Sequence, residues 1–326
     1  MKRSILITAI ALVSAISTSK AVPPTFHSIL TNQLQKYNFL GDYDSCKYVY
    51  NEFLKSDNPY FTSDIESLVE VAIFMQDTAN AIALFKELLM KTETDTTILS
   101  QNPKLSALRT YPQFQQIEQE YENLKLYYYK NFNLKLSQQI LEMYTKDRFI
   151  RIQVPRDCDC RPTIMEKTDR ENFETIKKIV EKSGFPTLSQ IGDEAWKGLY
   201  IIFLHISALS EQHFQYADSL LKKQVDLFIL EPWRYANMVD SYLHFKNIPQ
   251  RYGTFTVHDE NNSPTHGNIF EPENLDRRRY EIGLNSFTSF SKALKHKKLP
   301  DGYNYIDPLE YYFENKENKE NTEHTD

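Results

Sequence analysis

Apolar residues recur at helical spacing along most of the chain, and this pattern predicts an all-α, mainly helical protein. In the first third, an apolar residue falls at every third or fourth position over three segments. We expect helices there over Asp42–Lys55, Thr62–Met75 and Ala79–Lys91. Each would carry one apolar face, so consecutive helices should pack against one another.

Two stretches of this first third share a plan. The sequence YNFLGDYDSCKYVYNEFL (37–54) predicts a helix, a Gly-Asp turn and a second helix, and VAIFMQDTANAIALFKELL (71–89) repeats that order. The pair resembles a tetratricopeptide-like array of α-hairpins, although the full tryptophan, glycine and proline consensus is missing. Residues 102–117 are expected to form the closing helix. Such arrays bind or scaffold more often than they catalyse, which favours a protein or peptide partner.

The second half predicts a separate helical domain interrupted by one extended segment. Helices are expected over Leu134–Ile152, Arg170–Ser183, Ser189–Leu209, His213–Leu230, Pro232–Asn247 and Pro272–Leu294. Between the last two, TFTV (254–257) alternates like a strand and predicts a short β-hairpin or an extended loop.

The domain boundaries follow from these patterns. We expect a signal peptide over 1–21, the repeat region over 22–130, the C-terminal domain over 131–295 and an extension over 296–326. Beyond Phe313 the extension is polar and of low complexity, which favours disorder.

Composition supports folded domains and argues against a nucleic-acid partner. The chain has 326 residues, of which 41% are hydrophobic, enough for two cores. Its net charge is −6, and no segment is basic enough to follow a phosphate backbone.

The N-terminus predicts export. Lys2 and Arg3 precede an apolar run over 5–16, and cleavage is expected after Ser17 or Ala21. The run is shorter than the roughly 20 apolar residues of a membrane-spanning helix. We therefore expect a periplasmic or secreted protein without a membrane span.

The three cysteines leave two interpretations open. Cys158 and Cys160 form DCDCR (157–161), whereas Cys46 stands alone. The pair could be redox-active or bind a metal in an oxidising compartment. Alternatively, Cys46 forms one disulfide with either partner, or the thiols stay free. The second interpretation is favoured, because a Cys-x-Cys ring is tight and no further metal ligand stands nearby. We expect no metal and no cofactor.

Charged and polar residues fall on the apolar faces of several C-terminal helices. Buried charges are costly unless they meet partners, so these groups should form one shared polar cluster or two ion pairs. They are Asp147, Arg151, His205, Asp240 and Arg279, with Arg278 beside the last.

Residues 135–290 resemble an uncharacterised bacterial domain family of unknown function. The motifs stand in the family's order: Asp147-x-x-x-Arg151, Asp169-x-x-Asn172, Gly184-Phe185-Pro186, Ile191-Gly192, His205, Asp240, Gln250-x-Tyr252-Gly253-Thr254 and Asp276-x-Arg278-Arg279-x-x-x-Gly283-Leu284. Two positions depart from the pattern, with Ser241 in place of arginine and Phe255 in place of glutamine. The resemblance implies no established activity. It implies only that the charged residues on apolar faces belong to the family's motifs.

Two functions fit these residues. In a hydrolase, His205 would be the general acid or base, oriented by Asp240 or Asp147, and two arginines would hold an anionic substrate. In a binding protein, the same cluster would recognise a small anionic ligand or stabilise the domain. The expected ligand-binding residues are Arg151, Gln250, Tyr252, Thr254, Arg278 and Arg279, at the rim of a pocket. Binding is favoured, because no known nucleophile, metal or nucleotide motif is present.

Overall fold

The computed structural model describes residues 24–56, 60–296 and 298–322, and these are mainly helical. A single two-stranded antiparallel sheet stands among the helices of this part. The expected all-α class with a short β-hairpin is therefore confirmed. The expected signal peptide lies outside the described residues. None of the described helices is long and apolar enough to cross a membrane.

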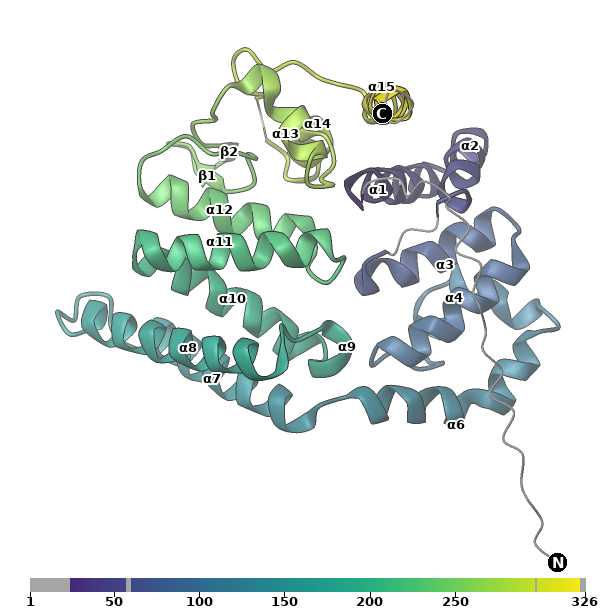
Figure 1. Cartoon of the computed structure of the whole chain (residues 1–326), viewed down its shortest axis with the longest axis horizontal. Helices are drawn as coiled ribbons and strands as arrows, with labels where there is room; N and C mark the ends of the chain where they lie inside the picture. The colour runs from purple at the N-terminus through teal and green to yellow at the C-terminus, as the bar shows by residue number, and fades with distance from the viewer. Residues whose placement is uncertain (1–23, 57–59, 297, 323–326) are drawn as a thin grey trace, which may run out of the picture.

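The first half is a series of helices that pack on their neighbours (Figure 1). Aspartates begin two of them, because Asp42 and Asp77 accept hydrogen bonds from free backbone N–H groups of the first turn. The elements are α1 (Pro24–Leu40), α2 (Tyr43–Leu54), η1 (Thr62–Asp64), α3 (Ile65–Phe74), α4 (Thr78–Lys91), α5 (Ile98–Gln101), η2 (Leu105–Thr110) and α6 (Phe114–Asn131).

The second half stacks further helices beside the first half. The elements are α7 (Leu134–Gln153), α8 (Arg161–Ser183), α9 (Leu188–Ile191), α10 (Asp193–Leu209), α11 (Glu211–Asp226), α12 (Pro232–Phe245), β1 (Thr256–His258), β2 (Pro264–His266), η3 (Pro272–Asn274), α13 (Leu275–Tyr280), α14 (Phe287–Ala293) and α15 (Pro308–Thr322). In the hairpin, Val257 pairs with Thr265.

Three predicted helices are interrupted in the structure. The one over 102–117 becomes the 3₁₀ helix η2 and the start of α6, because Pro112 separates them. Gly192 divides the one over 189–209 into α9 and α10, with a φ of 76° that favours glycine. A Cβ at this position would stand 2.0 Å from Oε1 of Glu93, so the glycine also permits close packing. Gly283, with a φ of 83°, ends the helix expected over 272–294.

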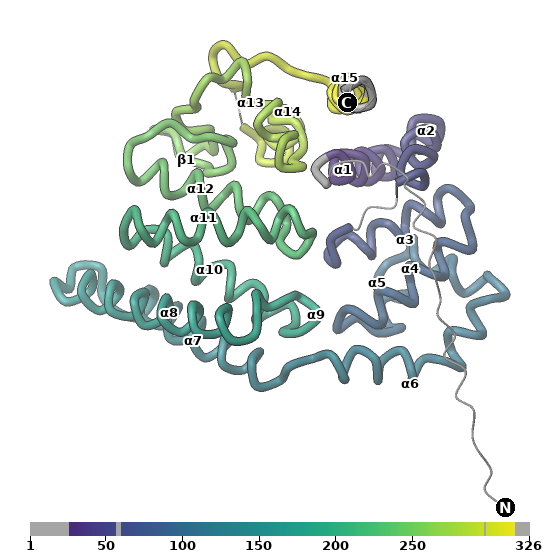
Figure 2. Tube along the Cα trace, viewed as in Figure 1, coloured from purple at the N-terminus to yellow at the C-terminus, as the bar shows by residue number. Residues whose placement is uncertain are grey.

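The chain returns to its own beginning and forms an incomplete ring (Figures 1 and 2). Helix α6 crosses from the first half to the second, and α15 lies against α1. There Phe26 contacts the rings of Tyr311 and Tyr312, with ring centroids 6.0 and 5.7 Å apart. Helix α15 extends to Thr322, and the expectation of disorder at the end of the chain stays a prediction.

Candidate functional site

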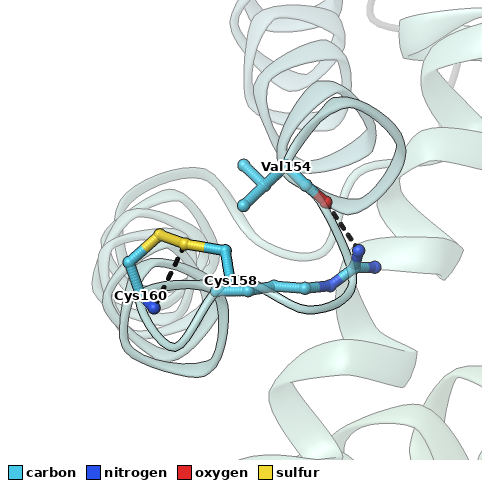
Figure 3. The surroundings of a disulfide bond; sticks show 4 residues. Val154, Cys158 and Cys160 are labelled. Carbon is cyan, nitrogen blue, oxygen red and sulfur yellow. Dashed lines mark hydrogen bonds between the residues drawn. A yellow bond between two sulfur atoms is a disulfide. The ribbon is translucent and has the colours of Figure 1, made fainter.

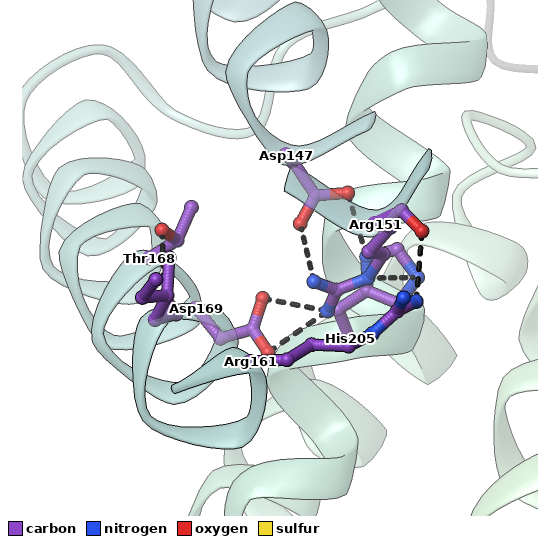
Figure 4. A network of polar contacts seen from close by, with 7 residues as sticks. Asp147, Arg151, Arg161, Thr168, Asp169 and His205 are labelled. Carbon is purple, nitrogen blue, oxygen red and sulfur yellow. Dashed lines mark hydrogen bonds and ion pairs between the residues drawn. The ribbon is translucent and has the colours of Figure 1, made fainter. Parts of the chain in front are cut away.

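The charged residues predicted from the sequence separate into two clusters. The first, called the histidine cluster, consists of Asp147 and Arg151 on α7, Asp169 on α8 and His205 on α10 (Figure 4). Arg151 is its centre. The guanidinium donates to both oxygens of Asp169 at 2.8 and 2.9 Å, and it lies 3.2 Å from Oδ1 of Asp147.

Both nitrogens of His205 are engaged in this cluster. Nε2 accepts a hydrogen bond of 3.1 Å from Nε of Arg151. Nδ1 lies 2.9 Å from Oδ2 of Asp147. A nitrogen accepts from a guanidinium through its lone pair, so the Nε2 lone pair of His205 is occupied by Arg151. In this arrangement Nε2 does not serve as a general base.

The histidine cluster places one guanidinium between two carboxylates. Asp147 is fully buried, and burial raises the pKa of Asp169 despite the opposing effect of Arg151. Asp147, Asp169 and His205 each present one possible metal ligand, with these atoms within 4.8 Å of one another. The guanidinium of Arg151 already contacts all three side chains. A metal ion could bind these three side chains only by displacing the guanidinium, which already supplies a positive charge between the carboxylates.

A disulfide stands beside this cluster, at the start of α8. Cys158 is bonded to Cys160 (Figure 3). Cys46 is a buried free thiol. The alternative disulfide from Cys46 is therefore wrong. The adjoining Arg161 donates to the carbonyls of Val154 and Arg151 at 2.6 and 2.8 Å. It thus satisfies free carbonyls at the end of α7.

The second cluster, called the turn cluster, surrounds Asp240 of α12. This carboxylate is fully buried and accepts from the backbone N–H groups of Arg251, Tyr252 and Thr254 and from the Thr254 hydroxyl, at 2.7–3.0 Å. Gln250 closes the same turn, because its side chain bonds both the N–H and the carbonyl of Phe255. Burial raises the pKa of Asp240, and these hydrogen bonds oppose that effect.

The two predicted anion-binding arginines hold backbone carbonyls instead. Arg279 is 1% exposed and donates to the carbonyls of Tyr252 and Asn285. Burial lowers its pKa to about 10, so it stays charged at neutral pH. Arg278 donates to the carbonyls of Arg251, Phe270 and Glu271.

These contacts correct two expectations about the site. Among the described residues, the polar partners of His205 belong to the histidine cluster, and those of Asp240 belong to the turn cluster, so the two side chains do not form one catalytic group. Gln250, Tyr252 and Thr254 are buried rather than at a pocket rim, at 1%, 6% and 7% exposure. They are buried because their turn is folded around the Asp240 carboxylate.

A third feature, the central cleft, lies where the two halves of the ring face each other. It consists of two adjoining hollows of about 550 and 420 Å³, which share Ser63, Glu231, Trp233 and Arg234. The first-half wall comes from η1, α3 and the end of α4, and the second-half wall from α10 and the start of α12. Volumes of this size suit small-molecule sites.

Aromatic rings and charges meet in the second-half wall. The guanidinium of Arg234 lies 4.6 Å from the ring centroid of Trp233 and 5.1 Å from that of Tyr200. It also donates to Glu231 at 2.8 Å. The indole N–H of Trp196 points at the same carboxylate, 3.3 Å from Oε2. The chain has only two tryptophans, and both line the cleft.

The turn cluster supports this wall. Asn237 donates to the carbonyl of Thr254 at 3.2 Å and accepts from the Tyr200 hydroxyl at 2.6 Å. Thr254, which holds Asp240, is therefore joined to the Tyr200 ring of the cleft by two successive hydrogen bonds through Asn237.

A buried lysine fixes part of the opposite wall. Nζ of Lys125 on α6 donates to the carbonyls of Leu89, Thr92 and Thr94 at 2.9–3.3 Å, and the last two residues line the cleft. Burial lowers its pKa. In the sequence this lysine stands within a helical segment of mixed polarity, which gave no sign of burial.

Comparisons with known proteins found no relative of this chain. No protein-family model, no curated protein and no solved structure matches it. The resemblance of residues 135–290 to a bacterial domain family therefore stays a prediction.

Proposed function

We propose that this is a ligand-binding protein and that its ligand occupies the central cleft. The observation that carries the proposal is the composition of that cleft, which both halves of the chain line with two tryptophans, a tyrosine and ionisable groups. Binding sites typically combine apolar and aromatic surface with a few placed polar groups in a concavity between structural units.

The proposal does not assign a reaction. Both nitrogens of His205 are engaged, and Arg278 and Arg279 are occupied by backbone carbonyls. An enzyme acting through these residues would need free acid, base or anion-binding groups. In our proposal the two clusters instead stabilise the helices that form the cleft wall.

Tryptophan fluorescence tests this function directly. A panel of cationic, neutral and anionic small molecules is titrated into the full chain while indole emission is recorded. We expect at least one compound to change the emission saturably, because both indoles line the cleft. Trp233→Ala should abolish binding measured by calorimetry. Tyr127→Ala is the matched control, because that side chain is similarly exposed, on α6. Equal affinity in both variants would contradict the proposal.

We also propose that the protein is exported. A basic and then apolar N-terminus supports this, and so does the Cys158–Cys160 disulfide, since such bonds persist in oxidising compartments. Expression in a bacterial host followed by intact-mass measurement tests it. The expected product lacks residues 1–17 or 1–21 and is found outside the cytoplasm. A full-length product retained in the cytoplasm would contradict export.

A further inference from the structure

The charges of the central cleft are unbalanced. Its acidic side chains outnumber its basic ones. They are Asp64, Glu66, Asp193, Glu194 and Glu231, against Lys197 and Arg234. Of the five carboxylates, only Glu231 forms an ion pair within the described residues, with Arg234. Two of the other carboxylates accept hydrogen bonds from neutral amide side chains. Gln35 donates to Asp64, and Asn102 donates to Glu66.

Carboxylates in and beside the cleft oppose the ionisation of Asp64 and Asp193. Burial raises the pKa of Asp64 to about 6, and the charge of Glu231 adds to this effect. The pKa of Asp193 is raised by burial and by Glu93, Glu194 and Glu231, which Arg234 only partly offsets. A cation placed among these groups would relieve their repulsion.

Arg234 shows how this wall holds a cation. Its guanidinium lies over two aromatic rings and against a carboxylate, the arrangement that recognises organic cations in water. Trp233 is still 48% exposed, so it retains aromatic surface for a second cation.

We propose that the ligand of the central cleft carries at least two alkylammonium groups on an extended chain. This inference rests on the proposed function and names its ligand class. The two hollows share one aromatic wall, and unpaired carboxylates lie in both, Asp64 in one and Glu66, Asp193 and Glu194 in the other. One ammonium group would bind in each hollow, with the linking methylenes against Trp233. Linear polyamines and lysine side chains of a short peptide share this chemistry.

Calorimetric titrations of the full chain at pH 7.5 test the ligand class. The probes are spermidine, the tripeptide Lys-Gly-Lys, magnesium chloride and the dianion succinate. We expect saturable binding of spermidine or the tripeptide, and the stronger of the two identifies the source. Magnesium and succinate should not compete at equal concentration. Binding of magnesium in place of both amines would overturn the proposal, as would the absence of amine binding.

Charge-neutralising variants test the site. Asp193→Asn and Asp64→Asn should each weaken amine binding by roughly fivefold at pH 7.5, the upper end for a partly exposed ion pair. Glu142→Gln on α7 is the matched control and should bind as the wild type does. Wild-type affinity should fall as the pH is lowered from 7.5 to 5, because Asp64 takes up a proton near pH 6. Amine binding that neither variant weakens would overturn the proposal.

The outcomes separate this inference from the function on which it rests. If a neutral or anionic compound binds and Trp233→Ala abolishes that binding, the cleft is a ligand site but its ligand is not a polycation. If no compound of the panel binds and neither tryptophan responds, the proposed function fails as well.

Discussion

His27 is a buried histidine held in its neutral form. It is 1% exposed, its Nδ1 lies 2.7 Å from the Ser56 hydroxyl, and its ring stacks on Phe53. Burial lowers its pKa to about 4. The unfolded chain therefore binds a proton at this histidine between pH 6.5 and 4, whereas the folded chain does not.

Acidification should accordingly destabilise the fold through this side chain. The contribution of His27 is fully present above pH 6.5 and is lost as the pH falls toward 4, with a total on the order of 3 kcal/mol. Urea unfolding at pH 7, 6, 5 and 4 measures it. Asp64 titrates in the same pH range, but its protonation changes the free energy of unfolding in the opposite direction. Subtracting the His27→Gln profile from the wild-type profile removes the contribution of Asp64. An unchanged profile in His27→Gln, or an altered one in the exposed control His258→Gln, would contradict the assignment.

Lys125 is the second residue whose substitution should change the free energy of unfolding measurably. Its ammonium group satisfies three carbonyls at and beyond the end of α4. Lys125→Met keeps the aliphatic stem but leaves these carbonyls without their donor. We expect a loss of about 3 kcal/mol in the free energy of unfolding. Lys130→Met on the exposed face of the same helix should cost less than about 0.5 kcal/mol. Equal losses in urea unfolding would show that the carbonyl contacts contribute nothing.

At the scale of elements, the histidine cluster joins α7, α8 and α10. Its only guanidinium forms ion pairs with two buried carboxylates. Arg151→Met should therefore lower the free energy of unfolding by about 3–5 kcal/mol, because it leaves these charges unpaired. Arg148→Met, an exposed position on the same helix, is the control. Thermal unfolding measures both. A melting temperature of Arg151→Met within a degree of the wild type would rule out the cluster as a stabilising feature.

The turn cluster joins α12 to the segment before the hairpin. Asp240→Asn replaces one acceptor oxygen by an N–H₂ group that faces backbone donors. We expect a loss of about 2–3 kcal/mol. We also expect faster hydrogen–deuterium exchange over 250–255 and at Tyr200, which this turn supports through Asn237. Asp301→Asn, at an exposed loop position, should leave exchange unchanged. Unaltered exchange over 250–255 in Asp240→Asn would contradict this role.

Sequence periodicity predicted these elements well where a helix has one apolar face. The ends of α2, α4 and α7 fall within a residue or two of the expected ones. It failed at Gly192 and Gly283, because the helical pattern continues through both glycines, whereas their φ angles of 76° and 83° interrupt the helix. Of the charged and polar residues predicted on apolar faces, Asp147, Asp240 and Arg279 are buried, whereas Arg151 and His205 are partly exposed. Their grouping was not predicted, because the sequence does not show that backbone N–H groups and carbonyls are the partners of Asp240 and Arg279.

At the scale of the whole molecule, the ring shape places the cleft. Contacts between distant segments close the ring, including α15 on α1 and the hydrogen bond of 2.9 Å from Asn32 to the Gly283 carbonyl. The cleft residues come from both halves of the sequence, and apart from Gly283 and Leu284 they lie outside the motifs, so the sequence did not predict the cleft. The one sequence signal for α10 and α12 is that they carry the two tryptophans of the chain.

Hydrogen–deuterium exchange of the full chain, with and without the compound that most changes tryptophan emission, tests the central claim most directly. The claim is that a ligand binds between the two halves of the ring. We expect slower exchange in both walls of the cleft at once, over 62–66 and 92–94 in the first half and over 193–201 and 231–237 in the second. Protection confined to one half, or to the surroundings of Asp147 and His205, would contradict it.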